Sequence, residues 1–268
     1  MKISVIIPAF NSAKSLEVAI QSVLEQTHTD FELIVMDGGS KDGTHELLQR
    51  YNEKLTYWQS QKDNGTTDAM NSGYKKATGE LITFLCSDDR FHDAQVFEKV
   101  VSTFKMQPDT DVLCPAIKVV DPEGYVHTYV SQSNPDRLYL HMSAHLPGAF
   151  FKRSILRSQP FDLSVEVAND YELFAYLQKQ KKPIMRVSDI IAVTFSLGGR
   201  TNDPKTDFWK AQECFFIRRK YYGFWAAWVP YLWDLSVASA RKAHIRPFRW
   251  VRKARRFVKG PLTASSDI

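Results

Sequence analysis

Two adjacent aspartates, Asp88 and Asp89, come three residues after an apolar run that ends at Leu85. The run has β-branched Thr83 inside it and is typical of a central strand that is covered on both faces. Neighbouring carboxylates at the end of a buried strand repel each other, and burial raises their pKa values. A hard divalent cation such as Mg²⁺ or Mn²⁺ would stabilise both, and such ions often complete their coordination with substrate phosphates. The alternative is that the pair caps the next segment or begins a turn.

The segments before this pair alternate between strand and helix. Apolar or β-branched runs predict four strands, at residues 4–8, 31–36, 55–58 and 81–85. This order indicates an α/β fold with a mostly parallel sheet and right-handed crossovers. The polar loops 8–11, 37–44 and 63–73 would then meet at one edge of the sheet, where a nucleotide would bind. The second of these loops has neither the G-x-G-x-x-G order of dinucleotide sites nor the Gly-Lys-Ser/Thr of a P-loop.

Four motifs in this order carry a resemblance: Ser4 to Asn11 (SVIIPAFN), Asp37 to Thr44 (DGGSKDGT), Asp63 to Gly73 (DNGTTDAMNSG) and Gly79 to Asp89. Together they resemble the family 2 glycosyltransferases, over residues 3 to about 195. The resemblance implies the GT-A fold, a Rossmann-like sheet flanked by helices, with a nucleotide-diphosphate sugar as donor and Mn²⁺ or Mg²⁺ as cofactor. The Asp-Gly-Gly-Ser and Asp-Ala-Met-Asn variants are most similar to bacterial enzymes that build surface polysaccharides such as lipopolysaccharide O-antigen.

The resemblance also implies which residues bind the metal and the donor. Asp89 would coordinate the metal, and Asp88 would contact the ribose or assist. The family often contacts uracil through the second Asp of Asp-Asp-Gly-Ser, but this chain has Gly38 there. A UDP-sugar is therefore favoured while the base stays open. The family's metal motif often begins with Asp where this chain has Cys86, which we interpret as a small buried residue and not as a thiolate ligand. The expected donor-binding residues are Pro8, Ala9, Phe10, Asn11, Asp37, Gly38, Asp68, Asn71 and Asp88.

A further motif of the family, a helix start that carries the general base, matches at Asn169-Asp170-Tyr171-Glu172. Inverting sugar transfer is a single in-line displacement, in which the acceptor hydroxyl loses its proton as it attacks and a positioned carboxylate can accept that proton. The resemblance assigns this role to Asp170. Glu172 would point in a different direction on a helix, and it is retained as a candidate for the acceptor or the diphosphate. The alternative for Asp170 is a carboxylate that stabilises a helix N-terminus.

Residues 101–200 are expected to form the acceptor-binding half of a catalytic domain over residues 1–200, with residues 1–100 as its nucleotide-sugar half. A strand at 112–120 and a hairpin partner at 125–130 would shape the acceptor site.

Two basic residues of this half are candidates for the diphosphate. His145 could contact it or a hydroxyl, or be structural. Arg200, in the loop Gly198-Gly199-Arg200-Thr201, could pair with it or belong to a plain linker.

The C-terminal region, 201–262, differs in kind. Between Lys205 and Lys259 it has 14 Lys and Arg against three acids, which gives +11 within a chain of net charge +5. Aromatic residues are interleaved with these cations, and residues 246–259 read as a basic amphipathic helix. An anionic membrane surface would suit this composition. The alternative is a helical pair that packs on the catalytic domain. Residues 263–268 are expected to be a disordered tail.

The whole sequence of 268 residues limits the other classes of protein. Its three cysteines are widely spaced, so neither a disulfide framework nor a zinc site is supported. No signal peptide precedes the first strand, and no apolar run approaches the roughly 20 residues that span a bilayer. We therefore expect a cytoplasmic enzyme that is peripheral on the inner face of the membrane, with no nucleic-acid module.

The function predicted from these motifs is an inverting, metal-dependent glycosyltransferase. It would act on a saccharide acceptor that is lipid-linked. A nucleotidyltransferase is an alternative, but it would be expected to have a Gly-rich basic loop after the first strand, where this chain has Pro8-Ala9-Phe10-Asn11. A non-catalytic sugar-nucleotide-binding protein on the membrane is the other alternative, which the retention of Asp88, Asp89 and Asp170 argues against.

Overall fold

The computed structural model describes residues 1–120, 126–129, 145–196 and 204–242. The first half alternates between strand and helix, as its apolar runs predict. Its elements are β1 (Ile3–Ala9), α1 (Leu16–Leu24), β2 (Phe31–Asp37), α2 (Thr44–Arg50), β3 (Tyr57–Ser60), α3 (Thr66–Lys76) and β4 (Leu81–Phe84). β1 pairs in parallel with β2 and with β4, and β2 with β3, so the parallel sheet predicted for residues 3–89 is confirmed.

The second half is less regular. Its elements are β5 (Arg90–Phe91), α4 (Val96–Met106), β6 (Val112–Val120), β7 (Val126–Tyr129), β8 (Phe150–Lys152), α5 (Asn169–Lys179), β9 (Ile184–Ser196), α6 (Asp207–Tyr222) and α7 (Phe224–Lys242), with 3₁₀ turns at Arg153–Ile155 and Pro204–Thr206. β6 and β7 form the predicted hairpin. The sequence does not predict β8, which enters antiparallel between β4 and β6 and makes this half of the sheet mixed.

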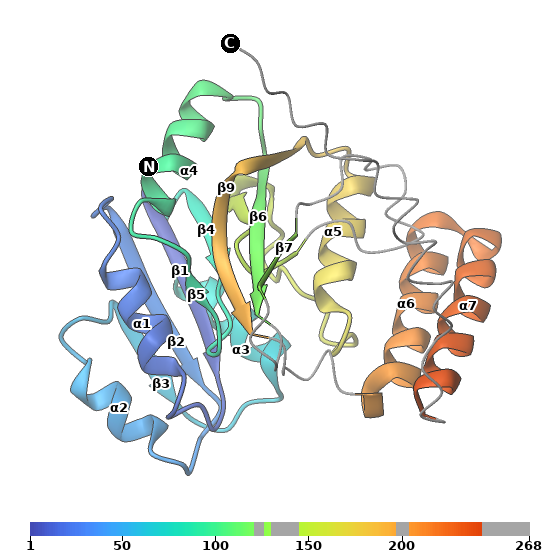
Figure 1. The fold of residues 1–268 in the computed structure, drawn as a ribbon, viewed down its shortest axis with the longest axis horizontal. Helices are drawn as coiled ribbons and strands as arrows, with labels where there is room; N and C mark the ends of the chain where they lie inside the picture. Colours follow the sequence, from blue (N-terminus) through green and yellow to red (C-terminus); the bar gives the residue numbers. More distant parts are fainter. Residues whose placement is uncertain (121–125, 130–144, 197–203, 243–268) are drawn as a thin grey trace.

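All the strands form one sheet, in the order β3-β2-β1-β4-β8-β6-β9-β5, with β7 paired to β6. Figure 1 shows α1 and α2 at one end of the molecule, and α5, α6 and α7 at the other. Both faces of the sheet are covered, because successive residues of β1 belong to two different cores. Ile6 packs with residues of α3 and α5, whereas Val5 and Ile7 pack with residues of α1 and α4. Such double coverage explains the continuous apolar sequence of the central strands.

A buried carboxylate ties the amino ends of three neighbouring segments together. Glu32 of β2 accepts hydrogen bonds from Ser4 Oγ at 2.5 Å and Thr78 Oγ1 at 2.7 Å, and Lys2 Nζ lies 2.6 Å from its Oε2. Burial raises the pKa of this carboxyl, but the bonds from Lys2, Ser4 and Thr78 lower it by more, to about 2. Glu32 therefore acts as an ionised connector between β1, β2 and the start of β4.

The helices that precede residue 243 are joined to the sheet layer. α6 contributes Cys214 and Ile217 to the core that contains Phe151 and Phe174. α7 is held to α6 by an ion pair of 2.6 Å between Arg218 Nη1 and Asp234 Oδ2. The predicted C-terminal helical extension is confirmed up to Lys242, and its boundary at residue 200 remains a prediction. The amphipathic helix predicted for 246–259 and the tail predicted for 263–268 lie outside the described residues.

Across the part of the chain that the structure describes, none of the helices combines the length and the apolar character needed to cross a membrane.

Candidate active site

The acidic pair lies at the carboxyl end of β4, as the sequence predicts. Asp89 is 1% exposed, whereas Asp88 is exposed. The Cys86 sulfur and one carboxylate oxygen from each aspartate lie within 4.8 Å of one another. The next two residues form β5, which pairs with β9 and fixes the loop at its far end. Three potential ligand atoms are therefore held together by strands on both sides.

The chemistry of these atoms fits a hard cation. Burial raises the pKa of the Cys86 thiol far above its ordinary value, and the carboxylates of Asp89, Asp88 and Asp170 raise it further. These surroundings disfavour a thiolate at Cys86, and thiolates suit softer metals than Mg²⁺. The two carboxylates remain, and oxygen donors of this kind suit Mg²⁺ or Mn²⁺. The start of α5, which carries Asp170, is joined to the loop at 63–73, because Asn169 Nδ2 donates to Thr67 Oγ1 at 3.0 Å.

The loop after β1 is held against both the second motif and the acidic motif. Asn11 has a left-handed backbone (φ 49°), donates from its backbone N to Ser40 Oγ at 2.6 Å, and accepts from the Lys41 backbone N at 3.1 Å. Ser12 Oγ lies 2.8 Å from Ser87 Oγ. Pro8 and Ala9 are buried beneath this loop, and the Phe10 ring is 64% exposed. An exposed ring at this edge of the sheet can stack on a planar base.

Asp37 shapes the loop that follows β2. Its carboxylate is 2% exposed and accepts hydrogen bonds from Ser40 N at 3.1 Å, from Ser40 Oγ, and from Ser60 Oγ at 2.6 Å. Most of its capacity is used inside the protein, so it orders the loop and leaves little room for a second partner.

The side chain of Asp63 fills the space beside Gly38, where a side chain at position 38 would lie. A Cβ at Gly38 would lie 3.0 Å from both carboxylate oxygens of Asp63. Asp63 is half-buried, and the backbone N of Gly65 donates to its Oδ1 at 2.9 Å. Burial raises the pKa of this carboxyl, with Asp68 and Asp37 adding to the increase. A carboxylate thus lies beside Gly38, but it comes from the loop after β3.

The two residues expected to bind the donor from α3 have other partners. Asp68 Oδ2 accepts from the backbone N and the side-chain amide of Asn64, both at 3.1 Å, and so closes the turn before the helix. Asn71 is 2% exposed, donates from Nδ2 to Phe161 O at 2.9 Å and accepts from Phe161 N at 3.0 Å. Because both ends of its amide are used, Asn71 is a structural link between α3 and residue 161, which corrects the expected donor contact.

Asp170 begins α5, as predicted, and is half-buried. Its Oδ1 accepts from the Tyr171 backbone N at 2.7 Å. Burial raises the pKa of Asp170, while the Lys210 ammonium on α6 lowers it. This carboxylate is therefore less acidic than an ordinary Asp and better able to take a proton.

The segment that leads into Asp170 is fixed by a residue that the sequence analysis did not single out. Glu213 of α6 is 6% exposed. Its carboxylate accepts from the backbone N of Glu166 and of Val167, both at 2.9 Å, and from that of Ala168 at 2.8 Å. These three N–H groups lie in the segment just before α5, where backbone groups need an acceptor when they are buried. α6 thereby positions the start of α5.

Glu172 of α5 has no exposed surface and contacts residues of α6. It accepts from Arg157 and from Tyr221 Oη, and Lys220 Nζ lies 3.1 Å from its Oε1. This correction follows from its position two residues after Asp170, which turns it to another side of the helix. Direct contact between Glu172 and an acceptor is not supported.

The remaining candidates are His145 and Arg200. His145 is half-buried, and burial lowers its pKa, so the ring is favoured in its neutral form. Neutral imidazole can contact a hydroxyl but brings no charge to a diphosphate. Arg200 lies outside the described residues.

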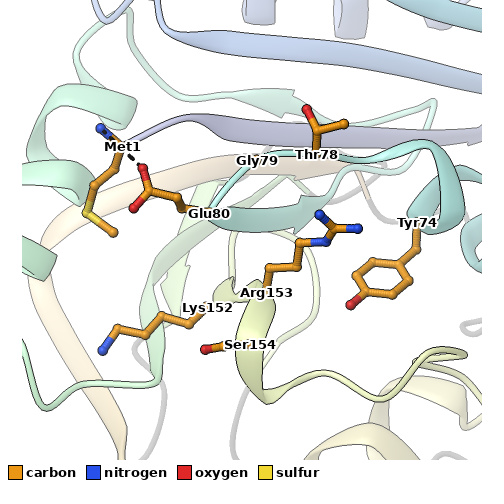
Figure 2. A pocket seen from close by; sticks show the side chains of 8 residues that line it. All are labelled: Met1, Tyr74, Thr78, Gly79, Glu80, Lys152, Arg153 and Ser154. Atoms are coloured by element: carbon orange, nitrogen blue, oxygen red, sulfur yellow. Dashed lines mark ion pairs between the residues drawn. The ribbon is translucent and has the colours of Figure 1, made fainter.

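A hollow of about 630 Å³ lies at the other edge of the sheet (Figure 2). It is lined by Met1, Tyr74, Thr78, Gly79, Glu80, Lys152, Arg153 and Ser154. These residues precede β1 and β4, or lie at the end of β8 and directly after it, so the hollow is on the side opposite to Asp88 and Asp89. It contains none of the residues predicted for the site.

Comparison with known proteins agrees with the motifs. The family model described as glycosyl transferase family 2 matches residues 4–164. An uncharacterized glycosyltransferase of Rickettsia typhi is 28% identical over 189 residues, 64% of this chain and 57% of the relative. A Bacillus subtilis glycosyltransferase assigned to teichuronic acid biosynthesis is 35% identical over 92 residues, 33% of this chain and 36% of the relative. The matched stretch thus spans about half or less of the length of these relatives.

Solved structures share the fold. S. aureus TarS 1-349 in complex with UDP-GlcNAc superposes with a TM-score of 0.65 and 20% identity, over 83% of this chain and 68% of that one. The mannosyltransferase PcManGT from Pyrobaculum calidifontis, in complex with GDP-Man and Mn²⁺, has a TM-score of 0.63 and 18% identity, over 96% of this chain and 79% of that one. The arrangement of the sheet and its flanking helices is that of the GT-A fold. Since the family model also covers more than half of the sequence, the chain belongs to glycosyl transferase family 2.

Proposed function

We propose that this protein is an inverting glycosyltransferase that moves a sugar from a nucleotide-diphosphate sugar to a hydroxyl of a saccharide acceptor. The observation that carries the proposal is the meeting of two kinds of carboxylate at one edge of the sheet. Asp88 and Asp89 form an oxygen-rich cluster after β4, and Asp170 lies in the first turn of α5, which is tied to the third donor loop by the 3.0 Å hydrogen bond from Asn169 Nδ2 to Thr67 Oγ1. The first group suits the donor's diphosphate through a cation, and the second suits the acceptor's proton.

In this proposal each residue has a limited task. Asp89 and Asp88 would hold Mg²⁺ or Mn²⁺, with Asp88 also in reach of the ribose. The bound ion would supply Lewis-acid stabilisation of charge on the diphosphate. Phe10 would stack on the base, and Asp37 would keep the loop at 37–44 in shape beneath it. Asp170 would accept the proton of the acceptor hydroxyl at its carboxylate, as the oxygen attacks the anomeric carbon.

We assign recognition of the base to Asp63. Its carboxylate lies beside Gly38, which has no side chain of its own to offer. A carboxylate accepts hydrogen bonds and donates none, so it suits the N3–H of uracil, and it also suits the N1–H and N2–H₂ of guanine. UDP-sugars remain the favoured donors, and GDP-sugars are the competing class. TarS, which binds UDP-GlcNAc, and PcManGT, which binds GDP-Man, show that this fold accepts either base.

The acceptor we propose is a lipid-linked saccharide of bacterial surface polysaccharide synthesis. The teichuronic acid relative supports this class of product. The charge of +11 between residues 205 and 259 supports a position on the cytoplasmic face of an anionic membrane.

A donor screen tests the proposal. Purified protein is titrated with UDP-, GDP- and dTDP-sugars, with Mn²⁺ or with EDTA, and release of nucleotide diphosphate is followed. We expect one base to be preferred and its binding to be metal-dependent, and Asp89→Ala to lose both. Release of pyrophosphate from a nucleoside triphosphate would instead identify a nucleotidyltransferase. Donor binding that never leads to hydrolysis or transfer, with Mn²⁺, lipid and saccharide acceptors present, would identify a non-catalytic binding protein.

A further inference from the structure

The outermost helix, α7, carries its large apolar side chains on the side that faces away from the protein. Two of its buried side chains are small, with Ala227 fully buried and Ala238 2% exposed. On its outer side Trp225 is 79% exposed, Val229 70% and Trp233 56%. A helix that covers a core normally has the reverse arrangement, with its apolar stripe turned inward.

The apolar surface continues from α7 onto α6. Contacts between aromatic rings connect the two helices. The ring centroid of Phe215 on α6 lies 5.7 Å from that of Phe216 and 5.8 Å from that of Trp228 on α7. Trp228 in turn stacks on Phe224, with 5.8 Å between the ring centroids. We define the aromatic face as the exposed members of this group, Phe216, Phe224, Trp225, Trp228, Val229, Leu232 and Trp233. Among the described residues these are seven of the 14 large apolar side chains that are exposed. Monomeric proteins seldom expose apolar area so concentrated unless something covers it.

The position of this face leaves it open to a large partner. α7 is the last described element and forms one end of the molecule, with α6 between it and α5 (Figure 1). The inner side of the pair is already committed, because Arg218 and Asp234 join the two helices and Glu213 holds the start of α5. Whatever covers the aromatic face therefore approaches from outside.

Charge decides between the occupants. From Leu235 to Gly260 the sequence has nine Lys and Arg and no acid, and Arg219 is exposed on α6. A second copy of the chain would bring like charges together, which opposes association. An anionic bilayer offers the opposite charge, and its headgroup layer is where tryptophan side chains prefer to lie.

We propose that the aromatic face is a membrane-docking surface, seated in the headgroup layer of an anionic lipid bilayer. Trp225, Val229 and Trp233, spaced four residues apart on one side of α7 and each more than half exposed, enter the layer, and the positive charge of the C-terminal sequence favours anionic headgroups. The three-dimensional structure adds to the composition of the C-terminal region by assigning insertion to one side of α7. This inference does not depend on the transferase reaction, because lipid binding is measured without donor or acceptor.

Vesicle binding tests it. Full-length protein is sedimented with sucrose-loaded vesicles of two compositions. One is phosphatidylcholine alone, and the other contains about 40 mol% phosphatidylglycerol, which gives a strongly negative surface. We expect at least tenfold stronger binding to the anionic vesicles and a blue shift of tryptophan emission on binding. The double variant Trp225→Ser with Trp233→Ser should lose tenfold or more of that affinity. Met106→Ser, at an apolar side chain 68% exposed on α4, is the matched control and should bind as the parent does.

The same experiments can also contradict the membrane-docking proposal. Binding that is equal in the double variant and the parent would assign attachment to charge alone and overturn the role of the aromatic face. A parent protein that is dimeric by light scattering, and becomes monomeric in the double variant, would assign the face to a second copy. Nucleotide binding and the thermal midpoint of the double variant, both unchanged, would show that it is folded.

Discussion

At the scale of single residues, the Asp63 carboxylate lies beside position 38. Both of its oxygens would be 3.0 Å from a Cβ at Gly38. Asp63→Asn keeps the size of the side chain but exchanges an acceptor oxygen for a donor group. We expect the Kd for the preferred nucleotide to weaken about tenfold or more, because a hydrogen bond to a charged group contributes about 1.5–3 kcal/mol. Isothermal titration measures this, and kcat for donor hydrolysis should change little, since the residue is not beside the reacting atoms.

Position 38 supplies the control. Gly38→Asp alone would put two carboxylates in contact and should also weaken nucleotide binding. Combined with Asp63→Ala, which removes the atoms that the new side chain would contact, it restores a single carboxylate beside position 38, so this double variant should bind better than Gly38→Asp or Asp63→Ala alone. A loss of nucleotide affinity in the double variant that equals the product of the two single-variant losses would show that positions 38 and 63 act independently.

The charges around Asp170 predict how activity depends on pH. A general base works only when ionised, and burial raises the pKa of Asp170 while Lys210 lowers it. Activity is therefore expected to be lost as the pH falls, at a pH above the range of an ordinary Asp. Lys210→Met removes the lowering charge and should move this acid limb to higher pH, with the plateau rate preserved. An acid limb that is unchanged by this variant would mean that another group controls the profile.

At the scale of elements, Glu213 connects the C-terminal helices to the chemistry. It accepts hydrogen bonds from three backbone N–H groups in the segment that leads into α5. Glu213→Gln leaves one acceptor oxygen, and we expect the free energy of unfolding to fall by about 2–4 kcal/mol. Because Asp170 follows this segment, kcat should fall more than nucleotide affinity does. Urea unfolding and steady-state kinetics measure the two effects, and equal losses in kcat and in affinity would argue for a general loss of folded protein.

Glu32 makes a prediction about stability and pH. Its folded pKa of about 2 is below the ordinary value of 4.5, so its stabilisation is fully present above that value and is lost as the pH falls towards 2. The difference corresponds to about 3 kcal/mol at neutral pH. Glu32→Gln should lower the free energy of unfolding by about that amount at pH 7, and by less than half of it at pH 3. A difference in free energy of unfolding between the parent and Glu32→Gln that does not change with pH would contradict this role of Glu32.

Elements defined by local pattern could be predicted from the sequence, and those defined by distant contacts could not. The strands before Asp88 are apolar on both faces and separated by helical segments, so their type and parallel pairing follow from the pattern. β8 has three residues, and its place between β4 and β6 depends on partners far away in the sequence. Asn71 matched a donor motif, but its amide is used by the backbone of Phe161, 90 residues later. The role of Glu213 in holding the segment before α5 likewise depends on residues about 45 positions apart in the sequence.

At the scale of the whole molecule, the C-terminal helices have two sides with different tasks. The inner side completes the core and holds the start of α5 through Glu213 and the cluster around Ile217. The outer side carries the aromatic face. Aromatic and basic composition indicated both packing and membrane attachment, and the structure assigns packing to one side while leaving the other exposed.

The central claim is that Asp89 serves the donor and Asp170 serves the proton of the acceptor, at one edge of the sheet. The most direct test is to measure donor affinity and turnover side by side in the parent, Asp89→Ala and Asp170→Asn. We expect Asp170→Asn to keep donor affinity within about threefold and to lose 10² to 10⁴ of the turnover, because it lacks the general base. Asp89→Ala should lose metal-dependent donor affinity as well. Turnover in Asp170→Asn at the parent rate, in a folded protein that binds its donor, would contradict the central claim.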